Sequence, residues 1–137
     1  RFNLFQLCDL LLEGDLNKAL RILAQLKAEG TEANLLNWAL LREIELLQQL
    51  KQAQLTRQNI NAIYKEKRIW ESRQQRYRLC LQRLEPAHLD TMAGLAAQID
   101  STLKQHNQPP WELFTQLCLL FDANYHRLDL PSGGQWR

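Results

Sequence analysis

The sequence predicts an all-α fold, a compact bundle of about six to seven helices around a central helix at roughly residues 32–54. Five glycines and four prolines in 137 residues leave few points at which a helix must end. No segment shows the alternation of apolar and polar residues that is typical of a half-buried strand. Residues with high helix propensity dominate the composition, above all Leu, Gln, Ala, Glu, Lys and Arg. A single domain of this length buries about 68% of its unfolded surface, enough for one core.

The first two expected helices are separated by a glycine. Residues 4–13 form an apolar run, and Gly14 is placed to end it in a left-handed conformation. Asp15 is placed to cap a second helix, whose apolar residues recur at helical spacing as far as Gly30. Gly30 therefore predicts a second tight corner, directly before the central helix.

The central helix has an apolar arc that covers roughly half of its circumference at about 100° per residue. The arc contains Leu35, Leu36, Ala39, Leu40, Ile44, Leu46, Leu47 and Leu50. An arc this wide needs more than one neighbouring helix to cover it. Thr31 is placed to accept hydrogen bonds from the free N–H groups of the first turn, and Glu32 favours the positive helix end.

The remaining helices are expected along the second half of the chain. Thr56 is placed to cap a short helix, and a longer helix is expected over residues 69–84. An amphipathic helix over residues 86–106 follows, with proline at a position that suits the first turn. The last expected helix spans residues 111–121.

The helices are expected to form one domain over residues 1–127. Residues 128–137 contain Pro, Ser and two Gly, and we expect them to form a mobile tail. The sequence begins at Arg1 and has its single methionine at Met92, so we expect it to be a fragment of a longer protein or a processed one.

The three cysteines indicate the compartment. Cys8, Cys80 and Cys118 are odd in number, far apart and flanked by apolar residues, which favours buried, reduced thiols in a cytosolic protein. No apolar run approaches the roughly 18 residues that a membrane helix needs, and no signal peptide is evident. We therefore expect a cytoplasmic protein without membrane contact.

Motifs for catalysis and for cofactors are missing from the sequence. Neither GxxxxGK[ST] nor GxGxxG occurs, so the chain lacks a glycine-rich loop for nucleotide phosphates. His88, His106 and His126 are far apart and lack metal-ligand spacing. No Ser or Cys nucleophile stands near a base in sequence. We expect no catalytic residues, no metal and no cofactor, and a small helical enzyme is the least favoured class.

One carboxylate falls inside the apolar arc of the central helix. Glu43 is flanked there by leucines and alanine, and a buried carboxylate must be paired because isolation is costly. One interpretation is a structural ion pair with an arginine of another helix, for which Arg21 and Arg68 are candidates. The alternative is that this face contacts a partner protein, with Arg42 at the edge of the arc reaching across the interface.

Positive charge is concentrated in the segment Lys65–Arg83. Seven basic and two acidic residues give this segment a net charge of +5, in a chain whose total is +2. Trp70 and Tyr77 lie one heptad apart, which places them on a similar face of a helix. The candidate contact residues of the segment are Lys67, Arg68, Trp70, Arg73 and Arg76.

The basic segment has three interpretations. Basic side chains neutralise phosphates and an exposed aromatic ring stacks on an unpaired base, so the first is nucleic-acid contact. The second is docking to an acidic protein. In the third, the segment is a solvated helix face and Trp70 is buried in the core.

Short motifs follow one another in order along most of the chain. They are Ala19-Leu20-x-Ile22-Leu23, Leu26, Glu29-Gly30-x-Glu32, Leu36, Leu40 and Arg42-Glu43, then Lys67-Arg68-Ile69-Trp70, Arg73, Leu81 to Leu84 and Leu103-Lys104-Gln105. In this set and order the chain resembles the C-terminal domains of the delta subunits of bacterial DNA polymerase III.

The resemblance implies a non-catalytic collar domain of the clamp loader, the ATP-driven pentamer that loads the sliding clamp on primed DNA during replication. In that family the C-terminal helical domains join into a collar, so other clamp-loader subunits are the expected partners. It also implies that the sliding clamp is bound through an N-terminal part, absent from this fragment, and that the ATPase sites lie in other subunits. Residues 107–110 depart from the aromatic-containing loop of some relatives, so no DNA contact is assigned to them.

Two hypotheses follow for the function. The first is the collar domain, which assembles the loader and has primed DNA passing near its basic segment. The alternative is an independent helical nucleic-acid-binding module that uses Lys65–Arg83.

Overall fold

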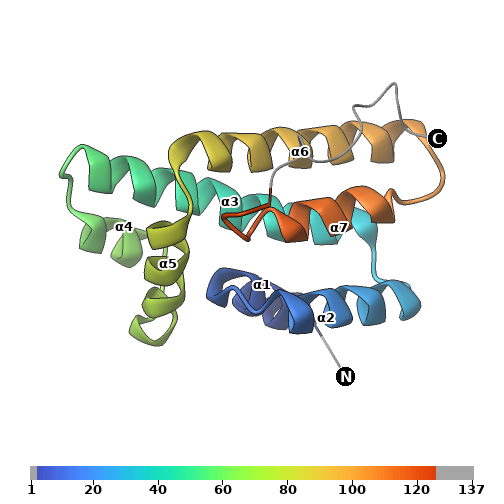
Figure 1. Cartoon of the computed structure of the whole chain (residues 1–137), viewed down its shortest axis with the longest axis horizontal. Helices are drawn as coiled ribbons and strands as arrows, with labels where there is room; N and C mark the ends of the chain where they lie inside the picture. Colours follow the sequence, from blue (N-terminus) through green and yellow to red (C-terminus); the bar gives the residue numbers. More distant parts are fainter. Residues whose placement is uncertain (1–2, 126–137) are drawn as a thin grey trace.

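The computed structural model describes residues 3–125, which form seven α-helices and no strand (Figure 1). The helices are α1 Leu4–Glu13, α2 Leu16–Ala28, α3 Ala33–Leu55, α4 Ile60–Glu66, α5 Glu71–Arg83, α6 Pro86–Gln105 and α7 Trp111–Leu119. The all-α prediction is confirmed, and every expected helix is present. The tail expected at residues 128–137 lies outside the described residues.

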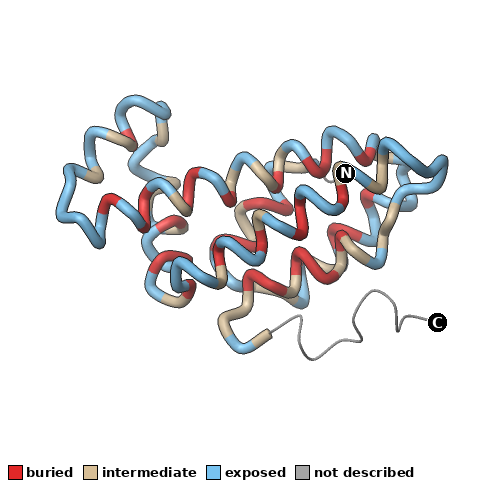
Figure 2. The backbone as a smooth tube through the Cα atoms, turned by 90° about the horizontal axis from the view of Figure 1, so that it is seen from above, coloured by how far each residue is buried: buried red, intermediate tan, exposed pale blue. Residues whose placement is uncertain are grey.

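Helix α3 is the central helix of the bundle, as predicted. It makes its most extensive contact with α6 and also packs against α1, α4 and α5. Figure 1 shows it crossing the middle of the molecule, below α6 and above the α1–α2 pair. Its fully buried side chains are Leu36, Leu40, Ile44, Leu47 and Leu50. In Figure 2 buried and exposed positions alternate along the long helices, as expected of amphipathic helices around one core.

Two glycines form the corners between the first three helices. Gly14 has a φ of 86° and Gly30 a φ of 76°, a conformation that glycine adopts without the steric cost of a Cβ atom. Asp15 caps α2 by accepting a hydrogen bond from the N–H of Lys18 at 3.3 Å. Both corners and this cap agree with the sequence prediction.

Two predicted helix caps are wrong. Glu32, not Thr31, occupies the N-cap position of α3, and no side chain caps that end. Thr56 ends α3 rather than starting α4, because its hydroxyl donates a hydrogen bond to the carbonyl oxygen of Gln52 at 2.8 Å. The cap of α4 is Asn59, whose side-chain oxygen accepts from two N–H groups of the first turn.

Helices α5 and α7 are shorter than predicted. Trp70 has an extended backbone, with φ −62° and ψ 148°, and occupies the N-cap position, so α5 begins at Glu71. Helix α7 ends at Leu119. Leu120 and Phe121 follow in a turn, and both are buried in the core despite leaving the helix.

All three cysteines are free and buried, as predicted. Burial raises the pKa of each thiol, to about 11 for Cys80 and about 12 for Cys118. Among residues 3–125, no helix is long and apolar enough to cross a membrane. In the same part of the chain, no three His, Cys, Asp or Glu side chains form a group suited to a metal ion.

Candidate functional site

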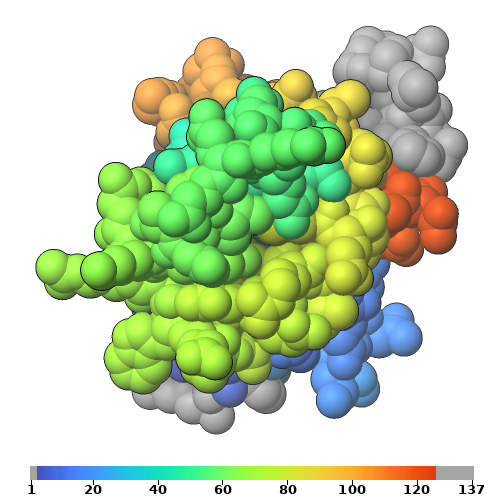
Figure 3. All heavy atoms as spheres, turned by 90° about the vertical axis from the view of Figure 1, so that its left-hand side faces the viewer, coloured from blue at the N-terminus to red at the C-terminus, as the bar shows by residue number. Residues whose placement is uncertain are grey.

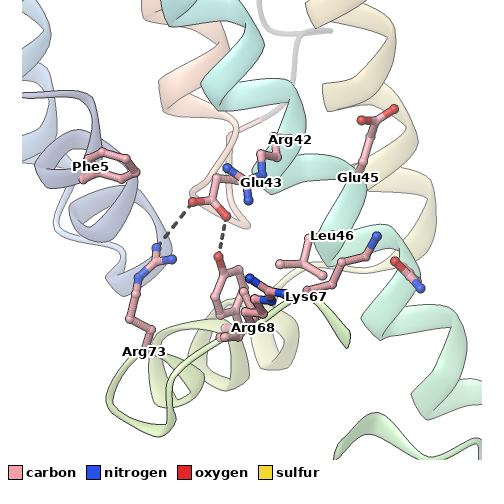
Figure 4. A pocket seen from close by; sticks show the side chains of 11 residues that line it. Phe5, Arg42, Glu43, Glu45, Leu46, Lys67, Arg68 and Arg73 are labelled. Atoms are coloured by element: carbon pink, nitrogen blue, oxygen red, sulfur yellow. Dashed lines mark hydrogen bonds and ion pairs between the residues drawn. The ribbon is translucent and has the colours of Figure 1, made fainter. Parts of the chain in front are cut away.

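A pocket of about 270 Å³ lies where α3 and α5 meet the connection between α4 and α5, close to the start of α1 (Figure 4). It is lined by Phe5, Arg42, Glu43, Glu45, Leu46, Gln49, Lys67, Arg68, Ile69, Arg73 and Tyr77. We call this the cationic pocket. It brings together five of the residues selected from the sequence, namely Arg42, Glu43, Lys67, Arg68 and Arg73.

Glu43 is paired with residues of α5. Its Oε2 lies 3.4 Å from Nη2 of Arg73, and its Oε1 accepts a hydrogen bond from the hydroxyl of Tyr77 at 2.5 Å (Figure 4). Its side chain is 13% exposed. The predicted structural pairing of this carboxylate is therefore observed, but the candidate partners Arg21 and Arg68 are wrong. Arg73 reaches Glu43 because α5 packs against α3.

Arg73 also binds α1. Its Nε and Nη2 donate hydrogen bonds to Oδ1 of Asp9 at 3.2 and 2.8 Å, and its guanidinium lies 5.4 Å from the centre of the Tyr77 ring. Burial alone would lower the pKa of Arg73, but Tyr77, the hydrogen bond to Asp9 and the charge of Glu43 outweigh it and raise that pKa. Burial and the adjacent Glu43 likewise raise the pKa of the Tyr77 hydroxyl. Arg73 thus joins α1, α3 and α5, and its charge is already balanced.

Arg76 and Trp70 of the basic segment differ in the structure from what the sequence predicts. Arg76 is paired with Glu13 of α1 at 2.5 Å, so its charge is balanced as well. Trp70 is 76% exposed whereas Tyr77 is buried, so the prediction that they share a face is wrong. Heptad spacing fails because Trp70 precedes the first turn of α5.

Three of the basic residues selected from the sequence are unpaired in the described part of the chain. Arg42, Lys67 and Arg68 are exposed, and none of them forms an ion pair within residues 3–125. The guanidinium of Arg42 lies 5.5 Å from the centre of the Trp38 ring, within range of a cation–π interaction. Arg68 has a φ of 56°, uncommon for a residue with a Cβ atom.

Trp70 belongs to the end of the molecule formed by α4 and the start of α5. Figure 3 shows this end from outside, with the C-terminal end of α3 above α4 and the segment that follows it. The exposure of Trp70 excludes the interpretation in which it is a core residue. It lines neither the cationic pocket nor the hollow beside it.

An apolar hollow of about 170 Å³ adjoins the cationic pocket and shares Phe5, Arg42 and Glu43 with it. It is lined by Leu4, Phe5, Cys8, Leu35, Trp38, Ala39, Arg42 and Glu43. Phe5 is 71% exposed, Leu35 49% and Trp38 57%. Leu35 was predicted on the apolar arc that neighbouring helices cover, and Phe5 and Trp38 were not among the predicted site residues. The sequence signal for this exposed surface was the apolar arc of α3, which is wider than its neighbouring helices can cover.

Comparisons with known proteins agree on one family. The family described as "Processivity clamp loader gamma complex DNA pol III C-term" matches residues 4–125, which contain all seven helices. The DNA polymerase III subunit delta of Escherichia coli (strain K12) is 35% identical to this chain over 120 residues. That alignment covers 87% of this chain and 35% of the relative. The chain therefore spans about a third of the length of the relative it matches.

Proposed function

This chain belongs to the family of C-terminal domains of DNA polymerase III clamp-loader delta subunits, and from that membership we propose that it is a non-catalytic collar domain. Its role is to join the other clamp-loader subunits in the pentamer that loads the sliding clamp on primed DNA, in the bacterial cytoplasm. The observation that carries the proposal is the extent of the family match, which begins with α1 and continues past the end of α7.

The internal structure supports an assembly role. Arg73 links α1, α3 and α5 through its ion pairs with Asp9 and Glu43, so these three helices are held in fixed relative positions. Phe5 of α1 and Leu35 and Trp38 of α3 are exposed around one hollow, and apolar patches of that kind are typical of protein–protein contacts. Contact with the sliding clamp is assigned to the N-terminal part of the longer subunit, not to this domain.

Size-exclusion chromatography with the other clamp-loader subunits tests the collar proposal. We expect this chain to co-elute with them in the absence of ATP and DNA. The matched control is a mixture with the sliding clamp alone, from which the chain should elute separately. Separate elution from the loader subunits at micromolar concentration would overturn the proposal.

One observation favours a second function, contact with nucleic acid. Trp70 is 76% exposed, and the unpaired cations Lys67 and Arg68 lie three and two residues before it in the chain. An exposed ring beside unpaired cations suits an unpaired base and its phosphates. Arg73 and Arg76 are bound to carboxylates, so the proposed contact set narrows to Lys67, Arg68 and Trp70.

The two functions are separable by experiment. An independent nucleic-acid-binding module would bind single-stranded DNA as the isolated chain, measurable by fluorescence anisotropy. A collar domain would show such affinity only in the assembled loader, where DNA is positioned next to it.

A further inference from the structure

We propose that the apolar hollow and the cationic pocket form one docking groove for a segment of a sister subunit in which apolar side chains are followed by carboxylates. The groove is defined by Phe5, Leu35, Trp38, Arg42, Lys67 and Arg68. This inference rests on the proposed collar function and names the chemistry of the partner.

The two depressions adjoin each other. Both are lined by Phe5, Arg42 and Glu43, which lie at their common boundary. The hollow extends from there over the first half of α3, towards Leu35 and Trp38. The pocket extends the other way, to the connection between α4 and α5 that carries Lys67 and Arg68. An extended or helical segment lying on α3 would therefore pass from one to the other.

The apolar half of the groove has the composition of a binding surface. Residues 3–125 expose six large apolar side chains, and three of these, Phe5, Leu35 and Trp38, line this one hollow. Phenylalanine, tryptophan and arginine are enriched in the centres of protein interfaces, and truncating Trp or Arg there often costs most of the affinity. Leaving this cluster in water is unfavourable, so a partner with apolar side chains gains by covering it.

The charged half of the groove selects carboxylates. Arg42, Lys67 and Arg68 have no ion-pair partner in the described part of the chain. Glu43 does not neutralise them, because Arg73 and Tyr77 already hold its two oxygens. Glu45 is the other carboxylate of the lining, so three free cations face one free anion. Aspartate or glutamate side chains would complete this balance.

A protein segment fits the whole groove better than a nucleic acid does. Phosphates would satisfy the three cations, but a sugar–phosphate backbone would leave the hollow at Leu35 and Trp38 without an apolar partner. Trp70, the exposed ring suited to a base, lies outside the groove lining. The proposed base contact at Trp70 therefore lies outside the docking groove, although both proposals use Lys67 and Arg68.

The test is assembly of the loader from its subunits, with this domain inside the full-length polypeptide. The groove variants are Trp38→Ala and the double variant Arg42→Glu/Arg68→Glu. The matched controls are Trp70→Ala, a second exposed tryptophan, and Leu55→Ala, an exposed leucine at the far end of α3. The readout is the subunit concentration at half assembly, from sedimentation velocity, with melting temperatures recorded for every variant.

We expect each groove variant to raise the half-assembly concentration at least tenfold at an unchanged melting temperature, with the controls at the parent value. Assembly of both groove variants at the parent concentration would overturn the groove while leaving the collar function intact. Failure of the parent subunit to assemble would instead remove the collar function, and the groove with it. If the double variant assembled normally but lost affinity for single-stranded DNA, the cations would serve nucleic acid and the docking proposal would be wrong.

Discussion

Arg73 of α5 and Asp9 of α1 are joined by two hydrogen bonds to one carboxylate oxygen, at 2.8 Å from Nη2 and 3.2 Å from Nε. The same Nη2 lies 3.4 Å from Glu43 of α3. Removing the guanidinium would leave the largely buried carboxylates of Asp9 and Glu43 without their cation. We expect Arg73→Ala to lower the free energy of unfolding by about 2–3 kcal/mol, less than for a fully buried pair because water partly screens this one.

Urea denaturation measures this loss. The matched control is Arg78→Ala on the same helix, where the side chain is exposed and, within residues 3–125, donates a hydrogen bond to Gln75 alone. That change should stay within about 0.5 kcal/mol. Equal effects of the two substitutions would mean that the Asp9–Arg73–Glu43 cluster adds nothing specific to stability.

The central position of α3 predicts which leucines are costly to truncate. Leu40 and Leu47 are fully buried, and replacing either with alanine should cost about 2–5 kcal/mol through lost burial and a residual cavity. Leu35→Ala on the same helix should cost less than about 1 kcal/mol, because Leu35 is 49% exposed. Chemical denaturation of the three variants checks the order. Losses below 1 kcal/mol at both buried sites would show that the core does not depend on α3.

Three glycines give a graded prediction for substitution by alanine. At Gly30 a Cβ atom meets nothing within 4 Å, so the cost is the positive φ alone, about 1–2 kcal/mol. At Gly14 the new Cβ would also lie 3.3 Å from the guanidinium carbon of Arg83, which should make this loss the larger one. At Gly94, exposed within α6, alanine should stabilise the fold by about 0.5–1 kcal/mol. Thermal unfolding of the set tests the order, and an unchanged melting temperature for Gly30→Ala would contradict the corner assignment.

Buried thiols make stability depend on alkaline pH. Burial raises the pKa of Cys80 to about 11 and that of Cys118 to about 12, whereas an unfolded thiol titrates near about 8.5. As pH rises above that value the unfolded chain loses protons first, so the free energy of unfolding falls. The contribution is complete below about pH 8.5 and is lost as pH approaches the folded-state values.

The measurement is the urea midpoint at mildly and strongly alkaline pH. Replacing both Cys80 and Cys118 with alanine should reduce the fall in midpoint between the two conditions, whatever its effect on absolute stability. An identical fall in parent and double variant would assign the pH dependence to other groups.

Local patterns were sufficient for the fold class and for most of the helices. The wide apolar arc identified α3 as central, and the glycines at positions 14 and 30 identified the two corners, because each signal depends on neighbouring residues only. Helix caps were harder to predict. The Thr56 hydroxyl donates a hydrogen bond to a carbonyl oxygen at the end of α3 as readily as it would accept one from the first turn of another helix. Single-residue choices of this kind depend on how the chain turns after each helix.

The candidate site was predicted in composition but not in pairing. The sequence indicated that Glu43 needs a cation, yet the choice of Arg73 depends on a crossing between helices 30 residues apart. The same crossing removes Arg73 from the proposed contact residues. The exposed Phe5 and Trp38 were missed because apolar periodicity shows which residues share a face, not whether another helix covers that face.

Replacing Trp70 distinguishes an effect on stability from an effect on DNA binding. Its ring is 76% exposed and caps α5 only through the backbone, so Trp70→Ala should leave the melting temperature within a few degrees of the parent. If the ring stacks on a base, the same change should weaken binding of primed DNA by the assembled loader by about 1–3 kcal/mol. Charge reversal at Lys67 and Arg68 should flatten the dependence of affinity on salt, because fewer condensed counterions are released.

Trp38→Ala is the matched control for this prediction, because Trp38 is also an exposed tryptophan but lines the docking groove. Measured at subunit concentrations that keep the loader assembled, Trp38→Ala should leave the affinity for primed DNA unchanged, whereas Trp70→Ala should not alter assembly. Charge reversal at Arg73 is excluded from the comparison, since it would break the contacts with Asp9 and Glu43 and lower stability. Equal losses of DNA affinity at Trp38 and Trp70 would mean that the base contact is not confined to Trp70. A melting temperature lowered by Trp70→Ala with DNA affinity retained would assign Trp70 a structural role instead.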